Sequence, residues 1–284
     1  MMTRQAIDAV VTMALAEDAP WGDVTSEAFI PADTTATASL VARVPGILAG
    51  GEVFLRTFLA VDEALTISLG VADGSAFLAG DVLATVTGNA RAILRGERVA
   101  LNLVQRMSGI ATATAEYVAR VEGTPARVVD TRKTMPGLRV LDRHAVVSGG
   151  GNNHRFSLSD AVLAKDNHLA VLTATGMSVT DAIRSVRSSI GHTTHLEVEV
   201  DRIDQIEPVL AGGVDTIMLD NFSLDELRAG VAIVAGRALV EASGNVSLDT
   251  IADIARTGVD IISVGALTHS VKALDLGLDV DLSR

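Results

Sequence analysis

Positively charged side chains gather in one stretch of an otherwise acidic chain, residues 130–168. Two of the three lysines, Lys133 and Lys165, lie there together with half of the six histidines and four arginines: His144, His154, His168, Arg132, Arg139, Arg143 and Arg155. A triple glycine at 149–151 interrupts the cluster, and glycine lets a backbone approach a ligand closely. The stretch predicts a loop-built site for a strongly anionic small molecule; the alternative is a solvated basic loop beside acidic neighbours.

The overall charge makes this local concentration of cations informative. The 284 residues carry a formal net charge of −12, with 48% hydrophobic and 20% charged residues. That composition is typical of a globular protein, and the charge would repel nucleic acid and anionic membranes. An anionic substrate would be repelled too, unless its site supplied positive charge. With no cysteine, disulfides and thiolate metal sites are excluded.

The N-terminal residues do not resemble an export signal, because Asp8 and Glu17 interrupt the apolar positions. No apolar run approaches the length of a membrane span. We therefore expect a soluble cytoplasmic protein with neither a membrane nor a nucleic acid as partner.

The N-terminal third has the pattern of a small mixed α/β domain. Helical spacing predicts an amphipathic helix over 4–17, and short β-like runs between glycine turns predict strands at 36–43, 65–69 and 82–86. A long helical pattern follows from 92 to 121, which Gly109 is expected to bend or split. Three arginines near its start, at 91, 95 and 98, suggest only a solvated helix end.

After Pro125, strands and helices alternate. Strands are expected at 127–130, 161–165, 196–200, 216–220, 238–241 and 261–264. Short aliphatic strands separated by helices are typical of parallel βαβ units. Six such units predict a TIM-like barrel, with a doubly wound open sheet as the alternative.

In a parallel barrel, functional residues gather where strands end. The strand ends here carry Thr131-Arg132-Lys133, Lys165, Asp220, Ser243-Gly244-Asn245 and Val264-Gly265-Ala266. The serine and glycine ends suit phosphate binding by backbone amides. Glu197, Glu199 and Asp201 alternate along one strand and share one side of it. Such a row is either solvated or serves sugar hydroxyls, Mg²⁺ or a developing positive charge.

Two further hypotheses concern a metal site and covalent catalysis. His192 and His195 are spaced to ligate a metal, but no third ligand follows at motif spacing, which favours a structural role. Lys165 at a strand end also suits a Schiff-base lysine.

Several long motifs together resemble one family, the quinolinate phosphoribosyltransferases. They are EDAPWGDVTS (17–26), ARVPGILAGG (42–51), GERVALNLVQRMSGIATAT (96–114), TRKTMPGLR (131–139), GGGNNHR (149–155), LAKDNH (163–168), EVEVD (197–201), MLDN (218–221), EASGN (241–245) and SVGALTHS (263–270). The resemblance covers nearly the whole chain in order.

The resemblance implies an α/β fold with two domains. An N-terminal α/β sandwich domain would comprise 1–108, joined by the C-terminal segment 268–284, and an incomplete TIM-like α/β barrel would comprise 109–267. The family's barrel has seven strands, so the seventh is expected within 142–159.

The resemblance also implies the reaction: quinolinate and phosphoribosyl pyrophosphate give nicotinate mononucleotide, pyrophosphate and CO₂, with Mg²⁺, in NAD biosynthesis. Arg132, Arg155 and Lys165 would hold the quinolinate carboxylates beside Thr131 and His154. Arg98 would join them from the other subunit of a homodimer. Lys133 would face the pyrophosphate, with Glu199 and Asp220 at the ribose and Mg²⁺. Backbone amides would bind the 5′-phosphate at Ser243, Gly244, Asn245, Val264, Gly265 and Ala266.

Other functions remain compatible with these residues. A paralogue could transfer phosphoribosyl to another pyridine or acceptor, and a Schiff-base aldolase could use Lys165. A non-catalytic sensor of phosphorylated metabolites is a third possibility, although simple anion capture has no use for Glu199 and Asp220.

Overall fold

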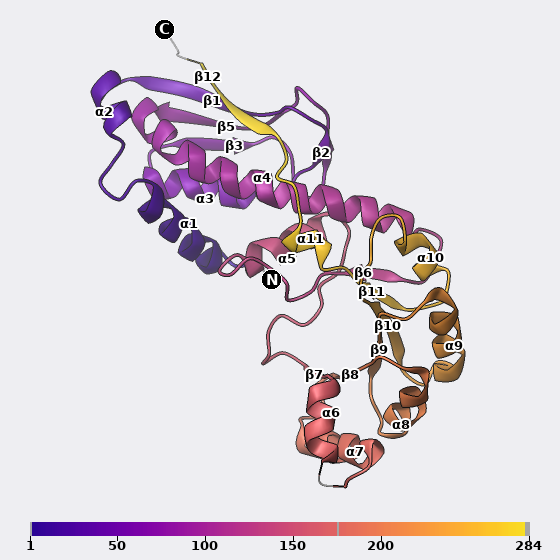
Figure 1. Ribbon diagram of the computed structural model, residues 1–284. Helices are drawn as coiled ribbons and strands as arrows, with labels where there is room; N and C mark the ends of the chain where they lie inside the picture. Colours follow the sequence, from indigo (N-terminus) through magenta and orange to yellow (C-terminus); the bar gives the residue numbers. More distant parts are fainter. Residues whose placement is uncertain (1, 175, 282–284) are drawn as a thin grey trace. The chain divides into compact units, whose positions relative to one another are not determined.

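A computed structural model describes residues 2–174 and 176–281 of the chain (Figure 1). The chain divides into two compact units: Met1–Ala115 with Thr134–Gly150 and Leu267–Arg284, and Glu116–Lys133 with Gly151–Ala266. The expected division had assigned 109–115 and 134–150 to the barrel. The structure places these segments in the first unit, where Arg106 of α4 (Ala90–Arg120) pairs with Asp142 of α5 (Arg139–Ser148) at 2.8 Å, and His144 of α5 pairs with Asp73 at 2.7 Å.

The first unit contains an antiparallel sheet in the order β12-β1-β5-β3. Its strands are β1 (Thr35–Ala42), β3 (Thr66–Leu69), β5 (Val82–Asn89) and β12 (Leu276–Asp281); β2 (Gly46–Ile47) pairs with β4 (Ala76–Phe77). The predicted strands at 36–43, 65–69 and 82–86 are confirmed. Alternate residues of β1 are buried, as expected for a sheet with one face covered. β12 pairs with β1 across nearly the whole chain length, and no local pattern predicted it.

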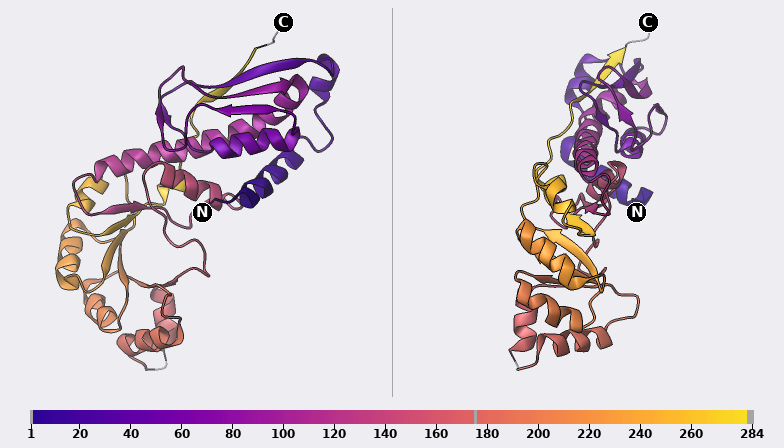
Figure 2. Two further views of the ribbon diagram at one scale, coloured as in Figure 1. Left: turned by 180° about the vertical axis from the view of Figure 1, so that it is seen from behind. Right: turned by 90° about the vertical axis from the view of Figure 1, so that its right-hand side faces the viewer.

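Six helices belong wholly or largely to this unit: α1 (Arg4–Asp18), α2 (Val24–Phe29), α3 (Gly51–Val61), α4 (Ala90–Arg120), α5 (Arg139–Ser148) and α11 (Ala266–His269). Figure 2 shows α3 and α4 lying along the sheet, where Phe54, Phe58 and Ile93 enter its core. Helix α4 is one helix of 31 residues, so the expected split at Gly109 is wrong. A Cβ at Gly109 would lie 2.3 Å from the Lys272 carbonyl oxygen, and glycine there lets the C-terminal segment cross the helix closely.

The second unit is built on a parallel sheet in the order β6-β11-β10-β9-β8-β7. All six strands are near their predicted positions: β6 (Arg127–Val129), β7 (Val162–Ala164), β8 (Leu196–Val200), β9 (Thr216–Asp220), β10 (Leu239–Ser243) and β11 (Ile261–Ser263). Helices cover its outer face (Figure 1): α6 (Asp166–Thr173), α7 (Val179–Ser189), α8 (Ile206–Ala211) after the short 3₁₀ helix η1 (Ile203–Gln205), α9 (Leu224–Val234) and α10 (Ile251–Ala255).

A seventh position in this sheet is occupied by a single residue. Asn152 forms a parallel bridge with Val129 of β6. The Asn152 amide donates to the Val128 carbonyl at 2.8 Å, and the Asp130 amide donates to the Asn152 carbonyl at 3.1 Å. Among the described residues β7 pairs with β8 alone, so the barrel does not close. The expected incomplete barrel is confirmed, with its missing strand reduced to one residue inside the 142–159 interval.

Within 2–174 and 176–281, no helix combines the length and the apolar character needed to cross a membrane.

Candidate functional site

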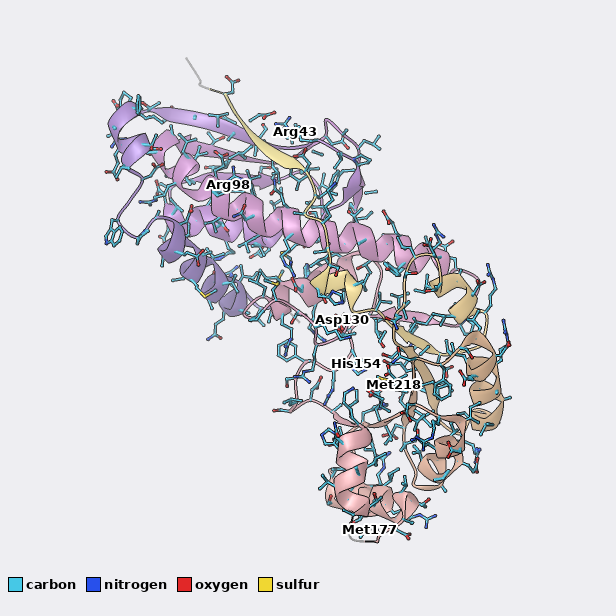
Figure 3. All side chains as sticks on the ribbon, in the orientation of Figure 1. Arg43, Arg98, Asp130, His154, Met177 and Met218 are labelled. Carbon is cyan, nitrogen blue, oxygen red and sulfur yellow. The ribbon has the colours of Figure 1, made fainter. Side chains whose placement is uncertain are left out.

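A cavity of about 560 Å³ opens at the carboxyl ends of the strands of the second unit. Figure 3 labels two of its lining residues, His154 and Met218. Eleven of the residues expected at the site line this cavity: Thr131, Arg132, Lys133, His154, Arg155, Lys165, Glu199, Asp220, Ser243, Gly244 and Asn245. Strand order explains the assembly, because parallel strands bring their carboxyl ends to the same edge.

The cations on one side of the cavity come from β6 and from the segment after Asn152. Arg132 and Lys133 follow β6 directly, where the Thr131 hydroxyl accepts a hydrogen bond from the Lys133 amide at 3.1 Å. Arg155 donates to the Ala161 carbonyl at 3.1 Å. Burial, and then the nearby positive charge of Arg132, lower the pKa of the Arg155 guanidinium below its ordinary value. Two guanidinium groups held this close create a local positive potential suited to a dianion.

Lys165 and Glu199 form an ion pair across neighbouring strands. β7 and β8 are in register with Ala164 opposite Val198, so the residue after each lies side by side at the strand ends. The Lys165 side chain is 49% exposed and that of Glu199 is 16% exposed. The pair therefore places one cation and one anion at the cavity wall, within reach of a ligand.

A tight hydrogen-bonded corner holds Asp220 at the end of β9. The Asn221 side chain donates to Asp220 at 2.8 Å and accepts from the Asn245 side chain at 3.1 Å. Asn221 and Asn245 both have positive φ, at 59° and 50°, a conformation that asparagine tolerates better than most residues. Gly244 has φ 97°, and a Cβ there would lie 2.2 Å from the Asn221 side-chain oxygen. This glycine is therefore required by both conformation and space.

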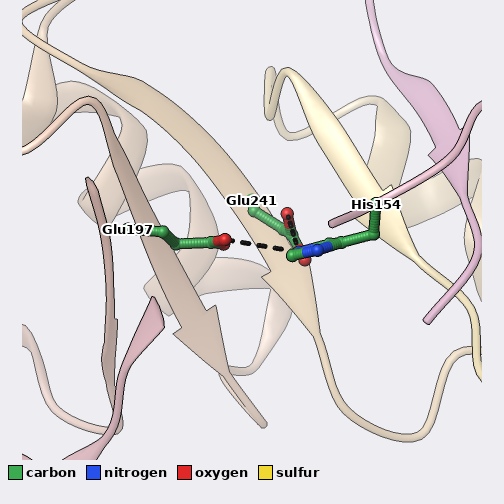
Figure 4. A group of neighbouring side chains, drawn as sticks. All are labelled: His154, Glu197 and Glu241. Carbon is green, nitrogen blue, oxygen red and sulfur yellow. Dashed lines mark ion pairs between the residues drawn. The ribbon is translucent and has the colours of Figure 1, made fainter. Parts of the chain in front are cut away.

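At the wall of the cavity, His154 lies between two buried glutamates (Figure 4). Its Nε2 is 3.3 Å from Glu197 and 3.4 Å from Glu241, which are 4% and 1% exposed. The Arg155 amide donates to Nδ1 at 2.7 Å, so Nδ1 carries no proton and the ring proton lies on Nε2, facing both carboxylates. Burial raises the pKa of Glu197. The resemblance implied His154 at the site, and the sequence placed Glu197 on one side of a strand with Glu199 and Asp201, but neither residue was connected with Glu241.

Four expected site residues do not line this cavity. Arg98 belongs to α4 of the first unit; it is exposed, and none of the described residues forms a hydrogen bond or ion pair with it in this chain. Val264, Gly265 and Ala266 do not line the cavity, whereas Ser263 does. The reason is that Val264 continues the ladder, donating to the Val129 carbonyl at 3.0 Å with its side chain buried.

Five lining residues were absent from the expected set: Leu163, Met218, Asn221, Glu241 and Ser263. Each lies in a predicted strand or just after one, so the alternation of side chains along those strands was the available signal.

The donors at the mouth fit a magnesium ion shared with a substrate. Glu199 and Asp220 both line the cavity, and Mg²⁺ is commonly held by one or two carboxylates together with substrate phosphates. Among the described residues the one close group of three potential metal ligands is His154, Glu197 and Glu241. The mouth thus offers part of a coordination sphere that a phosphorylated ligand would complete.

Family models match nearly the whole chain. The model described as the quinolinate phosphoribosyl transferase N-terminal domain matches residues 23–108, and that for the C-terminal domain matches 110–279. The chain belongs to this family.

Individual relatives agree with the family models. The nicotinate-nucleotide pyrophosphorylase [carboxylating] of Mycobacterium leprae is 46% identical over 279 residues, covering 95% of each chain. A quinolinate phosphoribosyltransferase [decarboxylating] of Nicotiana tabacum is 42% identical, covering 96% of this chain and 81% of the relative. The crystal structure of NadC from Streptococcus pyogenes superposes with a TM-score of 0.94 at 40% identity, covering 100% of this chain and 99% of that one. The family therefore includes two-unit proteins with this same fold.

Proposed function

We propose that this protein transfers a phosphoribosyl group from phosphoribosyl pyrophosphate to quinolinate, with loss of CO₂, in NAD biosynthesis. The products are nicotinate mononucleotide and pyrophosphate. The observation that carries the proposal is one cavity in which Arg132, Arg155 and Lys165 meet Glu199 and Asp220. Its cations suit a pyridine dicarboxylate, and its carboxylates suit the ribose of the donor. The name of the Nicotiana tabacum relative specifies the same substrate and the same loss of a carboxyl group.

The cationic wall binds quinolinate. Arg132 and Arg155 offer planar guanidinium groups that hold carboxylates with two parallel hydrogen bonds. Lys165 adds a third cation from the neighbouring wall. The whole chain has a formal charge of −12, which repels an anion. Each close pair of a cation of the site with a carboxylate of the ligand contributes about 4 kcal/mol of attraction before desolvation. Three such groups are enough to make this one cavity attractive to a dianion.

The carboxylates of the cavity, Lys133 and the amides at the strand ends bind the phosphoribosyl donor. Glu199 and Asp220 accept hydrogen bonds from the ribose hydroxyls, and with the donor's pyrophosphate they would hold Mg²⁺. Lys133 faces the pyrophosphate, and the backbone amides from Ser243 to Asn245 receive the 5′-phosphate. When bound, Mg²⁺ would neutralise charge that develops on the departing pyrophosphate.

Chemistry then proceeds in two steps. The pyridine nitrogen forms a bond to the anomeric carbon as the bond from that carbon to pyrophosphate breaks, through a state with positive charge on the ribose. The carboxylates of Glu199 and Asp220 stabilise that charge because they are fixed beside it. The carboxylate next to the now quaternary nitrogen leaves as CO₂, its electron pair remains on the ring carbon, and a proton replaces it there. Arg132, Arg155 and Lys165 stabilise the transient negative charge.

The site is completed in a homodimer, in which Arg98 of one subunit reaches the quinolinate of the other. What supports this is that Arg98 is exposed and that, within the described residues, no side chain of its own chain pairs with it. A buried or ion-paired arginine would have a structural explanation, whereas this one is available to a second copy.

A direct assay tests the reaction. Purified protein with phosphoribosyl pyrophosphate, Mg²⁺ and quinolinate labelled in the carboxyl group next to nitrogen should release labelled CO₂ and form nicotinate mononucleotide in equal amounts. Nicotinate in place of quinolinate is the control, because it lacks the carboxyl group next to the ring nitrogen. Turnover of nicotinate with no release of CO₂ from quinolinate would mean that the substrate is a different pyridine.

Subunit exchange tests the shared site. Arg98→Ala and Lys165→Ala homodimers should each be nearly inactive, since every site lacks one cation. After mixed unfolding and refolding, about half of the dimers should be hybrids, so about one quarter of all sites carry no defect. Activity should recover to that fraction, with refolded wild type and single variants as controls. If hybrids form, as shown by mass, and no activity returns, Arg98 is not donated across the dimer.

A further inference from the structure

The segment that carries His154 and Arg155 joins the parallel sheet at a single residue. It occupies the place of the seventh barrel strand, and among the described residues its ladder consists of the bridge at Asn152. A full parallel strand would be held along its length by regularly spaced hydrogen bonds. Side chains around the two residues beyond the bridge therefore help to fix their positions.

Asp130 supplies one of these contacts. It follows β6 and is fully buried, and its carboxylate accepts a hydrogen bond from the His154 amide at 2.7 Å. This contact extends the attachment of the segment by two residues beyond Asn152. It fixes the main chain at His154 but not the ring.

The ring is held from two sides. On one side Nε2 faces Glu197 and Glu241, at 3.3 and 3.4 Å. On the other side Nδ1 accepts a hydrogen bond from the Arg155 amide at 2.7 Å. The ring thus connects two strands, β8 and β10, with the main chain of the residue whose guanidinium lines the cavity.

The hydrogen bond at Nδ1 decides which chemistry this group can perform. An acceptor nitrogen carries no proton, so a neutral ring must hold its proton on Nε2, facing the two carboxylates. Binding of a metal through Nε2 would require the opposite tautomer. The three residues are close enough to hold a cation, but the donated amide bond favours a hydrogen-bonded clamp over a metal site.

The clamp formed by His154, Glu197 and Glu241 contains groups that destabilise the folded state. One oxygen of each glutamate is buried and has no hydrogen-bond partner among the described residues, and a buried carboxylate with incomplete partners destabilises the folded state. Packed apolar side chains at these positions are often neutral or stabilising. Glu241 lines the cavity and Glu197 lies against His154, so these two glutamates are better explained by what they hold in place.

We propose that Glu197 and Glu241 are positioning residues, which fix the His154 ring and through it the main chain of Arg155, so that the guanidinium is held at the quinolinate carboxylates. The inference rests on the proposed function for the identity of the ligand. The geometry of the clamp itself does not depend on that identity.

Three variants separate positioning from general stability. Glu241→Leu removes the acceptor, while Glu241→Gln keeps an oxygen that accepts from Nε2–H. Thr257→Val is the control: it removes a buried hydrogen bond elsewhere in the same unit, from the Thr257 hydroxyl to the Ile254 carbonyl at 2.6 Å, and Thr257 does not line the cavity. Each variant is measured for amide hydrogen exchange over 152–157, for quinolinate Kd by calorimetry, for KM of phosphoribosyl pyrophosphate and for thermal unfolding.

Glu241→Leu should speed exchange over 152–157 at least ten-fold and weaken quinolinate binding about ten-fold, with KM for phosphoribosyl pyrophosphate changed less than two-fold. Glu241→Gln should give a smaller change in the same direction, and Thr257→Val should lower the unfolding temperature without either effect. Unchanged exchange in Glu241→Leu overturns the clamp, whether or not the protein binds quinolinate. Faster exchange with unchanged quinolinate Kd overturns the link to Arg155. A wild type that binds no quinolinate refutes the proposed substrate, and the exchange result still decides the clamp.

Discussion

Removing the charge of Glu199 should tighten quinolinate binding even though it slows the reaction. In the structure the Lys165 ammonium is paired with Glu199. A quinolinate carboxylate must therefore compete with Glu199 for Lys165 and also approach a like charge. Glu199→Gln keeps the size of the side chain, removes the competitor and leaves Lys165 in place.

The size of the effect follows from the exposure of the pair. Lys165 is about half exposed, with 49% of its side chain accessible, so solvent screens the interaction and the pair is worth about 0.5–1 kcal/mol. That free energy corresponds to a two- to five-fold lower quinolinate Kd, measured by calorimetry in low salt. In the same variant kcat should fall at least ten-fold, because the proposed role of Glu199 is at the ribose and Mg²⁺.

Asp201→Asn is the matched control. Asp201 follows Glu199 by two residues, and it pairs with Arg202 on the surface instead of with Lys165. The substitution changes the net charge by the same amount as Glu199→Gln. Its quinolinate Kd should remain at the wild-type value. A weaker quinolinate affinity in Glu199→Gln, or an equal gain in Asp201→Asn, would refute the competition between Glu199 and the substrate for Lys165.

Three further changes test other parts of the molecule. Asp220→Asn should lower kcat at least ten-fold with quinolinate Kd unchanged by calorimetry; wild-type turnover at saturating Mg²⁺ would reduce Asp220 to a structural strand end. Gly244→Ala should destabilise the protein by about 1–2 kcal/mol and raise KM for phosphoribosyl pyrophosphate, whereas Gly213→Ala, with φ 86° and no atom within 4 Å of its Cβ, should destabilise without a change in KM. Asp73→Asn should cost about 1–2 kcal/mol of unfolding free energy at pH 7, a difference that shrinks in acid denaturation profiles.

The sign of that pH dependence comes from the surroundings of Asp73. Burial alone would raise the pKa of Asp73, but hydrogen bonds from His144 and from the amides of Gly50 and Gly51 outweigh it and lower the pKa. A carboxyl group with a lowered folded-state pKa stabilises fully above its unfolded value of about 3.9, and the contribution disappears as the pH falls through the folded value. A difference between variant and wild type that stayed constant down to pH 2 would contradict this account.

The local pattern of hydrophobic residues was sufficient to predict the barrel strands and most of the residues that line the cavity. Aliphatic runs such as Leu196–Val200 and Thr216–Asp220 have few alternatives to buried parallel strands, and parallel strands place their terminal residues at one edge. That is why the sequence alone assigns Lys165, Glu199 and Asp220 to one site. The family was also determined at this level, because its motifs extend in order along nearly the whole sequence.

Tertiary structure alone decided the remaining features. β12 adds to the first sheet by pairing with β1, and the seventh barrel position is filled by Asn152 without a strand pattern; both depend on which distant edge is free to accept hydrogen bonds. The contact of His154 with Glu197 and Glu241 has the same origin. Three segments far apart in sequence meet there because strand order brings them together. A glutamate that will be buried cannot be distinguished in the sequence from an exposed one, because its burial depends on these distant neighbours.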